Sequence, residues 1–243
     1  MLCSILSYNI HGLPWSKCRV DAICEFVIRT RPQIVCFQEA FTETVRARIC
    51  AALRRAGYIV CVPHDSGVTW LPSGLISAFL ETDYDILSSC FCPYQHFHNV
   101  EWFANKGFFT LRLRERTSGR IFYVGNTHMQ SNTEISWFFG SEVVRRIRLA
   151  QGNEIARYFA SVREPWCVVG DFNCDSAPCA NLRFLHPPGA RAGVQKRTFY
   201  STGEDLDHIA TGAHCKIPLL KMCRIYDMPY SDHAPVRFIA SFE

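Results

Sequence analysis

The sequence predicts a fold of the α/β (α+β) class, in which two mostly antiparallel β-sheets pack face to face with helices on the outside. Two observations predict it. Short apolar segments rich in β-branched residues outnumber the helical segments along the 243 residues. These segments also end repeatedly at a polar residue, so two packed sheets would bury the apolar parts and leave a row of polar side chains along one edge.

The composition favours one domain that spans residues 1–243. Apolar residues make up 48% of the chain and aromatic residues 13%, which is enough for a large packed core, and no linker or repeat divides the sequence. No apolar run is long enough to span a bilayer, and Met1 leads directly into a strand-like segment rather than a signal peptide. We therefore expect an intracellular protein without a transmembrane segment.

The cysteines predict reduced thiols. The chain has 13 of them, an odd number, and most lie in apolar segments, where cysteine behaves as a small buried hydrophobe. The pairs Cys90/Cys92 and Cys174/Cys179 lack the two-residue spacing of structural zinc sites, which argues against zinc.

The first part of the chain is expected to alternate strands and helices. Residues 4–10 form an apolar strand that leads into a Gly-Leu-Pro turn. Apolar residues at helical spacing then run from Val20 to Ile28, and Pro32 ends this helix because proline removes an N–H and clashes with the preceding turn. A buried strand at 33–38 follows, and Thr42 is a good N-cap for a second helix that Gly57 closes.

Strands dominate the remainder. Apolar segments predict them at 58–62, 75–80, 86–91, 121–127, 166–169, 206–211 and 234–242, with one helix over about 142–160. The strand at 108–114 alternates strictly. Its Phe109, Leu111 and Leu113 are expected to face inward, and Thr110, Arg112 and Arg114 outward.

One strand end organises the candidate site. The apolar run at 167–169 ends at Gly170, and Asp171 and Asn173 follow. Alternate side chains on an extended segment share a face, so Asp171 and Asn173 would point together while Phe172 points into the core. An acid and an amide aimed at one place can hold a water molecule. Gly-Asp-x-Asn is also good turn chemistry, so a plain exit from the strand is the alternative interpretation.

Glu39 is a candidate metal ligand. It follows the apolar run 34–37, where an unpaired carboxylate would cost several kcal/mol, so it needs a cation or a partner. Oxygen ligands without clustered cysteines suit a hard ion such as Mg²⁺, with Mn²⁺ as a substitute. A carboxylate at the entry to the next helix is the alternative.

Two histidine motifs stand near other strand ends. His128 follows the strand at 121–127. Asp232 and His233 are adjacent, so they project to opposite sides, one toward a metal and the other toward a phosphate. Asp207 supplies a further acid that could orient a histidine and fix its tautomer.

These motifs resemble the endonuclease/exonuclease/phosphatase superfamily in order and approximate spacing. The motifs are Ser7-Tyr8-Asn9, Phe37-Gln38-Glu39, Asn126-Thr127-His128, Gly170-Asp171-Phe172-Asn173, Leu206-Asp207-His208 and Ser231-Asp232-His233-Ala234-Pro235-Val236. The resemblance spans nearly the whole chain. It implies a four-layered sandwich and magnesium-dependent cleavage of phosphate esters.

The resemblance also implies a role for each residue. Asn9 and Glu39 belong to the metal site, and Asp232 completes it. Asp171 with Asn173 activates and orients the attacking water. His233, supported by Asp207, contacts or protonates the phosphate, and His128 stabilises the developing charge.

Motif details resemble the neutral sphingomyelinase branch most closely. They are Gln38-Glu39-Ala40-Phe41, His11-Gly12-Leu13-Pro14, Asn105-Lys106-Gly107 and Thr127-His128-Met129-Gln130. A phospholipid headgroup is then the expected substrate. Trp137, Phe138 and Phe139 are candidates for peripheral membrane contact, with helix packing as the alternative, and Trp70-Leu71-Pro72 has the same ambiguity.

Nucleic acid is the alternative substrate. Arginine accounts for 21 of the 26 basic residues and lysine for the other five, and arginine grips phosphate oxygens bidentately. Arg112, Arg114 and Arg116 on one strand, with Arg145, Arg146 and Arg148 on a helix, could form a basic stripe that tracks a nucleic-acid backbone. A binding module that keeps the fold without the chemistry is a third hypothesis.

Overall fold

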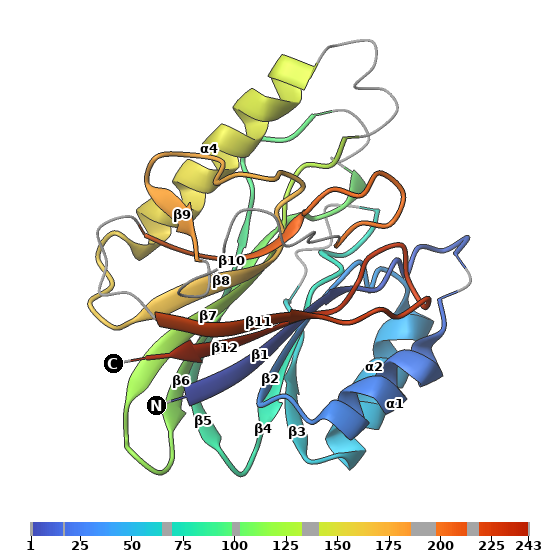
Figure 1. Cartoon of the computed structure of the whole chain (residues 1–243), viewed down its shortest axis with the longest axis vertical. Helices are drawn as coiled ribbons and strands as arrows, with labels where there is room; N and C mark the ends of the chain where they lie inside the picture. The colour runs from blue at the N-terminus through green and yellow to red at the C-terminus, as the bar shows by residue number, and fades with distance from the viewer. Residues whose placement is uncertain are drawn as a thin grey trace.

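The computed structural model places two six-stranded sheets face to face, with helices on both outer sides (Figure 1). It describes residues 2–16, 18–64, 70–98, 103–132, 141–185, 198–212 and 219–242. The first sheet has the order β11-β12-β1-β2-β4-β3 and the second β5-β6-β7-β8-β10-β9. Helices α1 and α2 cover the first sheet and α4 covers the second, which confirms the four-layered sandwich.

The element bounds follow the chain in order. The elements of the first sheet and its helices are β1 (Leu2–Asn9), α1 (Val20–Thr30), β2 (Ile34–Gln38), α2 (Glu43–Arg55), β3 (Tyr58–Cys61), β4 (Ile76–Leu80), β11 (Leu219–Ile225) and β12 (Val236–Ser241). Those of the second sheet and its helix are β5 (Tyr84–Pro93), β6 (Gly107–Glu115), β7 (Ile121–His128), α4 (Ser141–Phe159), β8 (Trp166–Asp171), β9 (Leu182–Phe184) and β10 (Asp207–Gly212).

Each sheet contains one parallel pair among antiparallel neighbours, as the prediction of mostly antiparallel sheets requires. β1 pairs with β2 in parallel, and β7 pairs with β8 in parallel. β12 runs antiparallel to β1, and β10 runs antiparallel to β8. The carboxyl ends of the four parallel strands and the amino ends of β10 and β12 therefore lie at one end of the sandwich.

The alternation of side chains sorts the core into three layers. Cys3 and Ile5 of β1 face the other sheet, whereas Leu6 and Tyr8 face α1 and α2. In β8, Cys167 and Val169 face the first sheet, and Trp166 and Val168 lie under α4. Strands buried on both faces read as continuous apolar runs, which explains why β1, β2 and β8 are the clearest strands in the sequence.

The helix ends follow local chemistry. Thr42 Oγ1 accepts the N–H of Val45 at 3.2 Å, so the predicted N-cap of α2 is confirmed. α1 ends at Arg31, whose left-handed φ of 43° turns the chain immediately before Pro32. Among the described residues, none of the helices combines the length and the apolar character that crossing a membrane requires.

The structure corrects several details. Two strands were missed: β9 has only three residues, and β11 is an edge strand with exposed Lys221, Met222 and Arg224, in which Lys221 and Arg224 interrupt the apolar residues. Thr110 was predicted to face outward but is buried, because α4 covers that face of β6 and Tyr158 contacts the Thr110 hydroxyl at 3.0 Å. The twelve described cysteines are free thiols, as expected.

Gly170 allows β7 and β8 to approach each other beside the strand end that carries Asp171. Its φ is 145°, and a Cβ there would lie 2.0 Å from the Thr127 carbonyl oxygen. We expect Gly170→Ala to lower the free energy of unfolding by about 3 kcal/mol, because backbone cannot give way as a flexible side chain can. Urea denaturation measures this.

Gly119 provides the matched control. It also has a left-handed φ, of 73°, but a Cβ there meets nothing within 4 Å. Gly119→Ala should cost only about 1 kcal/mol, the strain of the backbone conformation alone. Equal losses in the two variants would contradict the steric explanation.

Candidate active site

The predicted site residues converge at the end of the sandwich where the parallel strands stop. Asn9 ends β1, Glu39 follows β2, His128 ends β7 and Asp171 ends β8. Asp207 begins β10, directly opposite Asp171. The alternation that directs Cys167 and Val169 between the sheets also directs Asp171 there. The site is thus the polar end of the layer between the two sheets.

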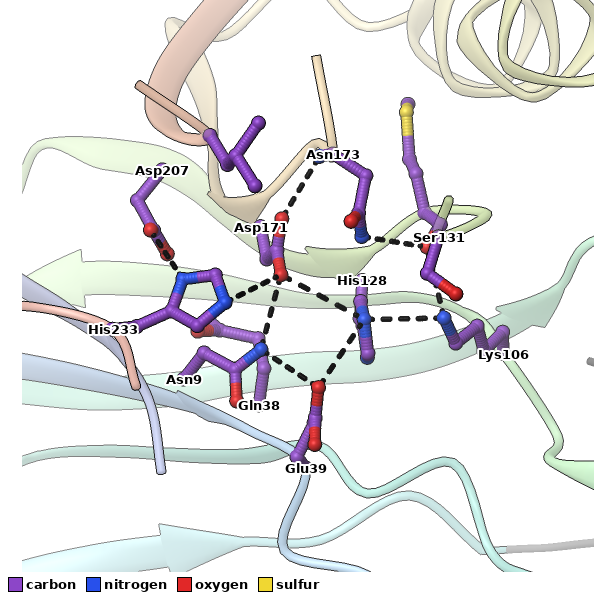
Figure 2. Close-up of polar contacts among 12 residues, drawn as sticks. Asn9, Gln38, Glu39, Lys106, His128, Ser131, Asp171, Asn173, Asp207 and His233 are labelled. Atoms are coloured by element: carbon purple, nitrogen blue, oxygen red, sulfur yellow. Dashed lines mark hydrogen bonds and ion pairs between the residues drawn. The ribbon is translucent and has the colours of Figure 1, made fainter. Parts of the chain in front are cut away.

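Two carboxylates meet at one amide. The Nδ2 atom of Asn9 donates to Glu39 Oε1 at 2.9 Å and to Asp171 Oδ2 at 3.0 Å (Figure 2). The Oδ1 atom of Asn9 accepts the backbone N–H of His11 at 3.1 Å, which fixes the orientation of the amide. Burial raises the pKa of Glu39, and the hydrogen bond from Asn9 and the charge of Lys106 oppose that shift.

His128 is held neutral beside these carboxylates. Burial, followed by the charges of Lys106 and His233, lowers the pKa of His128 well below its usual value. Its Nε2 atom lies 3.7 Å from Glu39 Oε1, 3.8 Å from Asp171 Oδ2 and 3.1 Å from Lys106 Nζ. A neutral ring can accept a bond from the lysine at Nε2 only with its proton on Nδ1, so the single lone pair of Nε2 faces Lys106 in this structure.

Lys106 is a site residue to which the sequence assigned no role. It is buried, and its Nζ atom donates to the Met129 carbonyl oxygen at 3.0 Å in addition to its contact with His128. It immediately precedes β6, whose first residues lie beside the end of β7. A lysine at the start of a strand is common, so only the pairing of β6 with β7 reveals that this one reaches the site.

Asp207 contacts His233, the histidine that it is predicted to orient. The Nδ1 atom of His233 lies 2.8 Å from Asp207 Oδ2, and its Nε2 atom lies 3.6 Å from Asp171 Oδ2. Burial favours the neutral ring, but the charges of Asp207 and Asp171 outweigh it and raise the pKa of His233 to about 10. Burial raises the pKa of Asp207 to about 6. The neighbouring carboxylates thus favour the protonated ring of His233.

Asn173 reaches the site by a different route from the predicted one. β8 stops at Asp171, and Asn173 has a left-handed φ of 53°, so the two residues do not share the face of an extended segment. Instead the Asn173 backbone N–H donates to Asp171 Oδ1 at 2.8 Å, and its side chain donates to the Met129 carbonyl oxygen at 3.1 Å. Phe172 is fully buried, as expected.

Asp232 lies beside the cluster and contacts His11. The His11 Nδ1 atom is 3.0 Å from Asp232 Oδ2 and 3.9 Å from Glu39 Oε2. Ser231 anchors this loop by donating to the Asn9 carbonyl oxygen at 2.7 Å. The prediction that Asp232 is a metal ligand stays a prediction, and His11 is a further neighbour of the site that the sequence did not single out by role.

Backbone strain gathers around the site. His11, Glu39 and Asn173 have φ values of 48°, 59° and 53°, and three of the four described non-glycine residues with positive φ are thus at this place. Such conformations cost free energy and persist where the surrounding structure imposes them, which is typical of functional sites.

A cavity of about 650 Å³ opens from the polar cluster. Glu39, Lys106, His128 and Ser131 line one part of it, and the rest of its lining is apolar: Leu13, Trp15, Phe41, Trp70, Leu71, Phe103 and Ala104. We call it the apolar cleft. Trp15 and Trp70 are 75% and 82% exposed at its rim. Trp137, Phe138 and Phe139, the predicted membrane contacts, lie outside the described residues.

The arginines do not form the basic stripe that was considered. Arg112 pairs with Glu164, and Arg114 and Arg116 both pair with Asp85. Arg114 lies opposite Ile121 at the start of β7, seven residues and roughly 23 Å from His128. On α4, Arg145 and Arg146 pair with Glu142, and Arg148 is buried against the Gln130 carbonyl oxygen.

Comparison with known proteins agrees with this architecture. The model of the Endonuclease/Exonuclease/phosphatase family matches residues 6–209, and the chain belongs to this family. Its enzyme class is accordingly that of the phosphodiester hydrolases. No curated protein sequence matches the chain.

Three solved structures share the fold at low identity. Sphingomyelinase C from Streptomyces griseocarneus is 18% identical with a TM-score of 0.76, and the match covers 99% of both chains. A Staphylococcus aureus beta toxin mutant with bound magnesium ions is 16% identical with a TM-score of 0.74 over 99% of this chain and 100% of the other. TDP2 from D. rerio, complexed with a single-strand DNA product, is 15% identical with a TM-score of 0.74 over 99% of both.

The donor set fits a divalent cation. Glu39, His128 and Asp171 each offer one ligand atom, and these three atoms lie within 4.8 Å of one another. Ligands about 2.1 Å from a Mg²⁺ ion are about 3 Å apart when adjacent and about 4 Å apart when opposite, so the three atoms are close to coordinating distance. The buried carboxylate of Asp171 and the half-buried carboxylate of Glu39 share one amide and also carry like charges, which a cation would offset.

We expect Mg²⁺ to stabilise the wild-type protein through Glu39. At 100 times its dissociation constant a ligand adds about 2.7 kcal/mol, or roughly 5 to 10 °C in Tm for a chain of this size. Glu39→Gln should abolish the shift, and its Tm without metal should not fall, because burial disfavours the charge of Glu39. Differential scanning fluorimetry measures both.

Glu25→Gln is the control, since Glu25 is exposed on α1. It should respond to Mg²⁺ like the wild type. A Mg²⁺ shift that survives in Glu39→Gln would remove Glu39 from the ion site.

Proposed function

We propose that this chain is a Mg²⁺-dependent phosphodiesterase acting on a phospholipid, in the manner of the sphingomyelinases. The observation that carries the proposal is the apolar cleft that opens directly on Glu39, Lys106 and His128. A phosphodiester joined to an apolar group matches a site that is charged at one part and apolar over the rest. The fold shared with sphingomyelinase C supports it.

Glu39 would hold the ion, and Asp171 Oδ2 and His128 Nε2 are the other ligand atoms within reach. The bound ion would neutralise phosphate charge and orient the ester. Asp171 Oδ2 lies 3.8 Å from His128 Nε2 and 3.6 Å from His233 Nε2, so it would face both the ion and the attacking water, which it can orient and from which it can accept a proton. Its other oxygen is held by the Asn173 backbone N–H, which fixes the carboxylate.

His233 would act on the phosphate itself. Asp207 takes up the Nδ1–H, so the Nε2–H is directed into the site. A protonated His233 can donate a hydrogen bond to a phosphate oxygen whose charge grows in the transition state. Lys106 adds a second cation beside His128.

A nuclease is the second candidate. Exposed Trp15 and Trp70 could stack nucleobases beside the phosphate site, and the fold shared with TDP2 in its single-strand DNA complex is compatible with this. Two observations argue against it: Arg112 pairs with Glu164, and Arg114, which shares Asp85 with Arg116, lies roughly 23 Å from His128.

A substrate panel separates the two candidates. With Mg²⁺ present, we expect phosphocholine release from sphingomyelin vesicles and no cleavage of plasmid DNA, abasic duplex or inositol phosphates. Glu39→Gln, purified in parallel, controls for contaminating nucleases and should be inactive on every substrate. Plasmid nicking by the wild type without phosphocholine release would contradict the lipid proposal.

Replacing Lys106 tests its role near the phosphate. We expect Lys106→Met to lower kcat/KM roughly 100-fold, as loss of one preorganised electrostatic contact does. The pKa of His128, followed by NMR, should rise in this variant because the lysine charge lowers it. Lys221→Gln, exposed on β11, should change neither quantity. An unaltered kcat/KM in Lys106→Met would refute the role.

A further inference from the structure

We infer that the apolar cleft binds a single alkyl chain of the substrate, so that the enzyme selects lipids one molecule at a time by their apolar part. The inference rests on the proposed function and adds the location and the length dependence of chain recognition. Four loops supply the apolar lining of the cleft: those after β1 and β2, and the segments before β4 and β6. His128 at the end of β7 and Ser131 after it complete the polar part.

The cleft wall is preformed. The Leu71 backbone N–H donates to the Phe103 carbonyl oxygen at 2.8 Å, and the Asn105 N–H donates to the Leu71 carbonyl oxygen at 3.2 Å. These bonds join the two segments in a parallel bridge, and the rings of Trp70 and Phe103 pack edge to face at 6.0 Å. A fixed wall avoids an ordering cost when a ligand binds.

The position of Phe41 connects the cleft to the chemistry. Phe41 is buried, and its ring centroid lies 6.5 Å from that of His128. A chain that lies along Phe41 therefore begins next to the phosphate site. The cavity volume of about 650 Å³ is within the range of sites that hold one small ligand.

The rim explains why an apolar occupant is expected. Two tryptophans that are 75% and 82% exposed leave a large apolar area in water, and both border the same cleft, so one occupant could cover both. The charged residues among its described lining, Glu39, Lys106 and His128, are those of the phosphate site. The described part of the wall thus offers no cation for a second phosphate, as a polynucleotide would require.

The test uses n-alkylphosphocholines of four to ten carbons below their micelle concentrations. Water attacks phosphorus, the bond from phosphorus to the alkyl ester oxygen breaks, and the alcohol leaves with a proton while phosphocholine forms. We expect kcat/KM to rise roughly two- to fourfold per methylene, the upper value corresponding to ~0.8 kcal/mol. Trp15→Ala and Trp70→Ala should each lower the octyl-to-butyl ratio at least roughly threefold.

Leu2→Ala is the matched control. Leu2 is 60% exposed, but it begins β1 and lies roughly 23 Å from Asn9 at the site. It should leave the octyl-to-butyl ratio unchanged. Binding of octylphosphocholine in EDTA, followed by tryptophan fluorescence, should weaken in Trp15→Ala and Trp70→Ala and gives a readout without turnover.

The outcomes separate this inference from the proposed function. Hydrolysis of all esters at equal rates would overturn the alkyl cleft and leave the phosphodiesterase intact. A length dependence that the two tryptophan variants retain, or that arises only above the micelle concentration, would place chain recognition elsewhere or at a lipid surface. If the binding affinity measured by fluorescence rises with chain length but no ester is hydrolysed, the cleft would be supported and the lipid hydrolase refuted. Preference for a thymidine phosphodiester would assign the cleft to a nucleobase.

Discussion

The site depends on one constraint: Glu39 and Asp171, both carboxylates, are brought to the same amide group of Asn9 in a largely buried setting. Like charges that share a donor repel each other, and burial makes this worse because water cannot screen them. The surroundings offset that cost with cations and donors. Lys106 reaches the site from the position immediately before β6, and His233 reaches it from the loop before β12. The His11 backbone N–H holds the Asn9 amide in the orientation that lets it donate to both acids.

The two sheets can hold this arrangement because buried amides join them just behind it. Asn126 on β7 donates to the carbonyl oxygens of Phe37 and Ile76 in the other sheet, at 2.9 and 3.1 Å, and accepts from Gln38 Nε2 at 2.8 Å. A buried amide is costly unless it is paired, and the Asn126 amide is paired at both its nitrogen and its oxygen, so it specifies one relative position of the sheets. The candidate site residues of the two sheets thereby keep a defined separation.

The surroundings of the site distinguish between substrates more clearly than the site itself. Metal, acid and histidine chemistry would serve any phosphodiester, so the central residues say little about the attached groups. Five of the six arginines that suggested nucleic acid pair with acids, and those of β6 lie toward its far end. The apolar side chains around the cleft come from loops that the strand pattern leaves unassigned.

The sequence by itself determined most of the architecture. Alternation and apolar runs predicted ten of the described strands and all three described helices, because burial on one or both faces leaves a local periodic signal. It missed β9 and β11, which are short or exposed and carry little of that signal. It also singled out the eight polar residues at strand ends, and seven of them contact one another as a single cluster with Asp232 at its side.

Only the tertiary structure decided which neighbours these residues meet. The order and register of the strands place Lys106 beside His128, turn Asn173 back onto Asp171, and separate the arginines of β6 from the site. The apolar cleft likewise exists only where four loops meet. The face of the sheet to which a side chain points follows from the alternation along its own strand. The residues that it contacts follow from pairings between strands distant in the chain, which local periodicity does not encode.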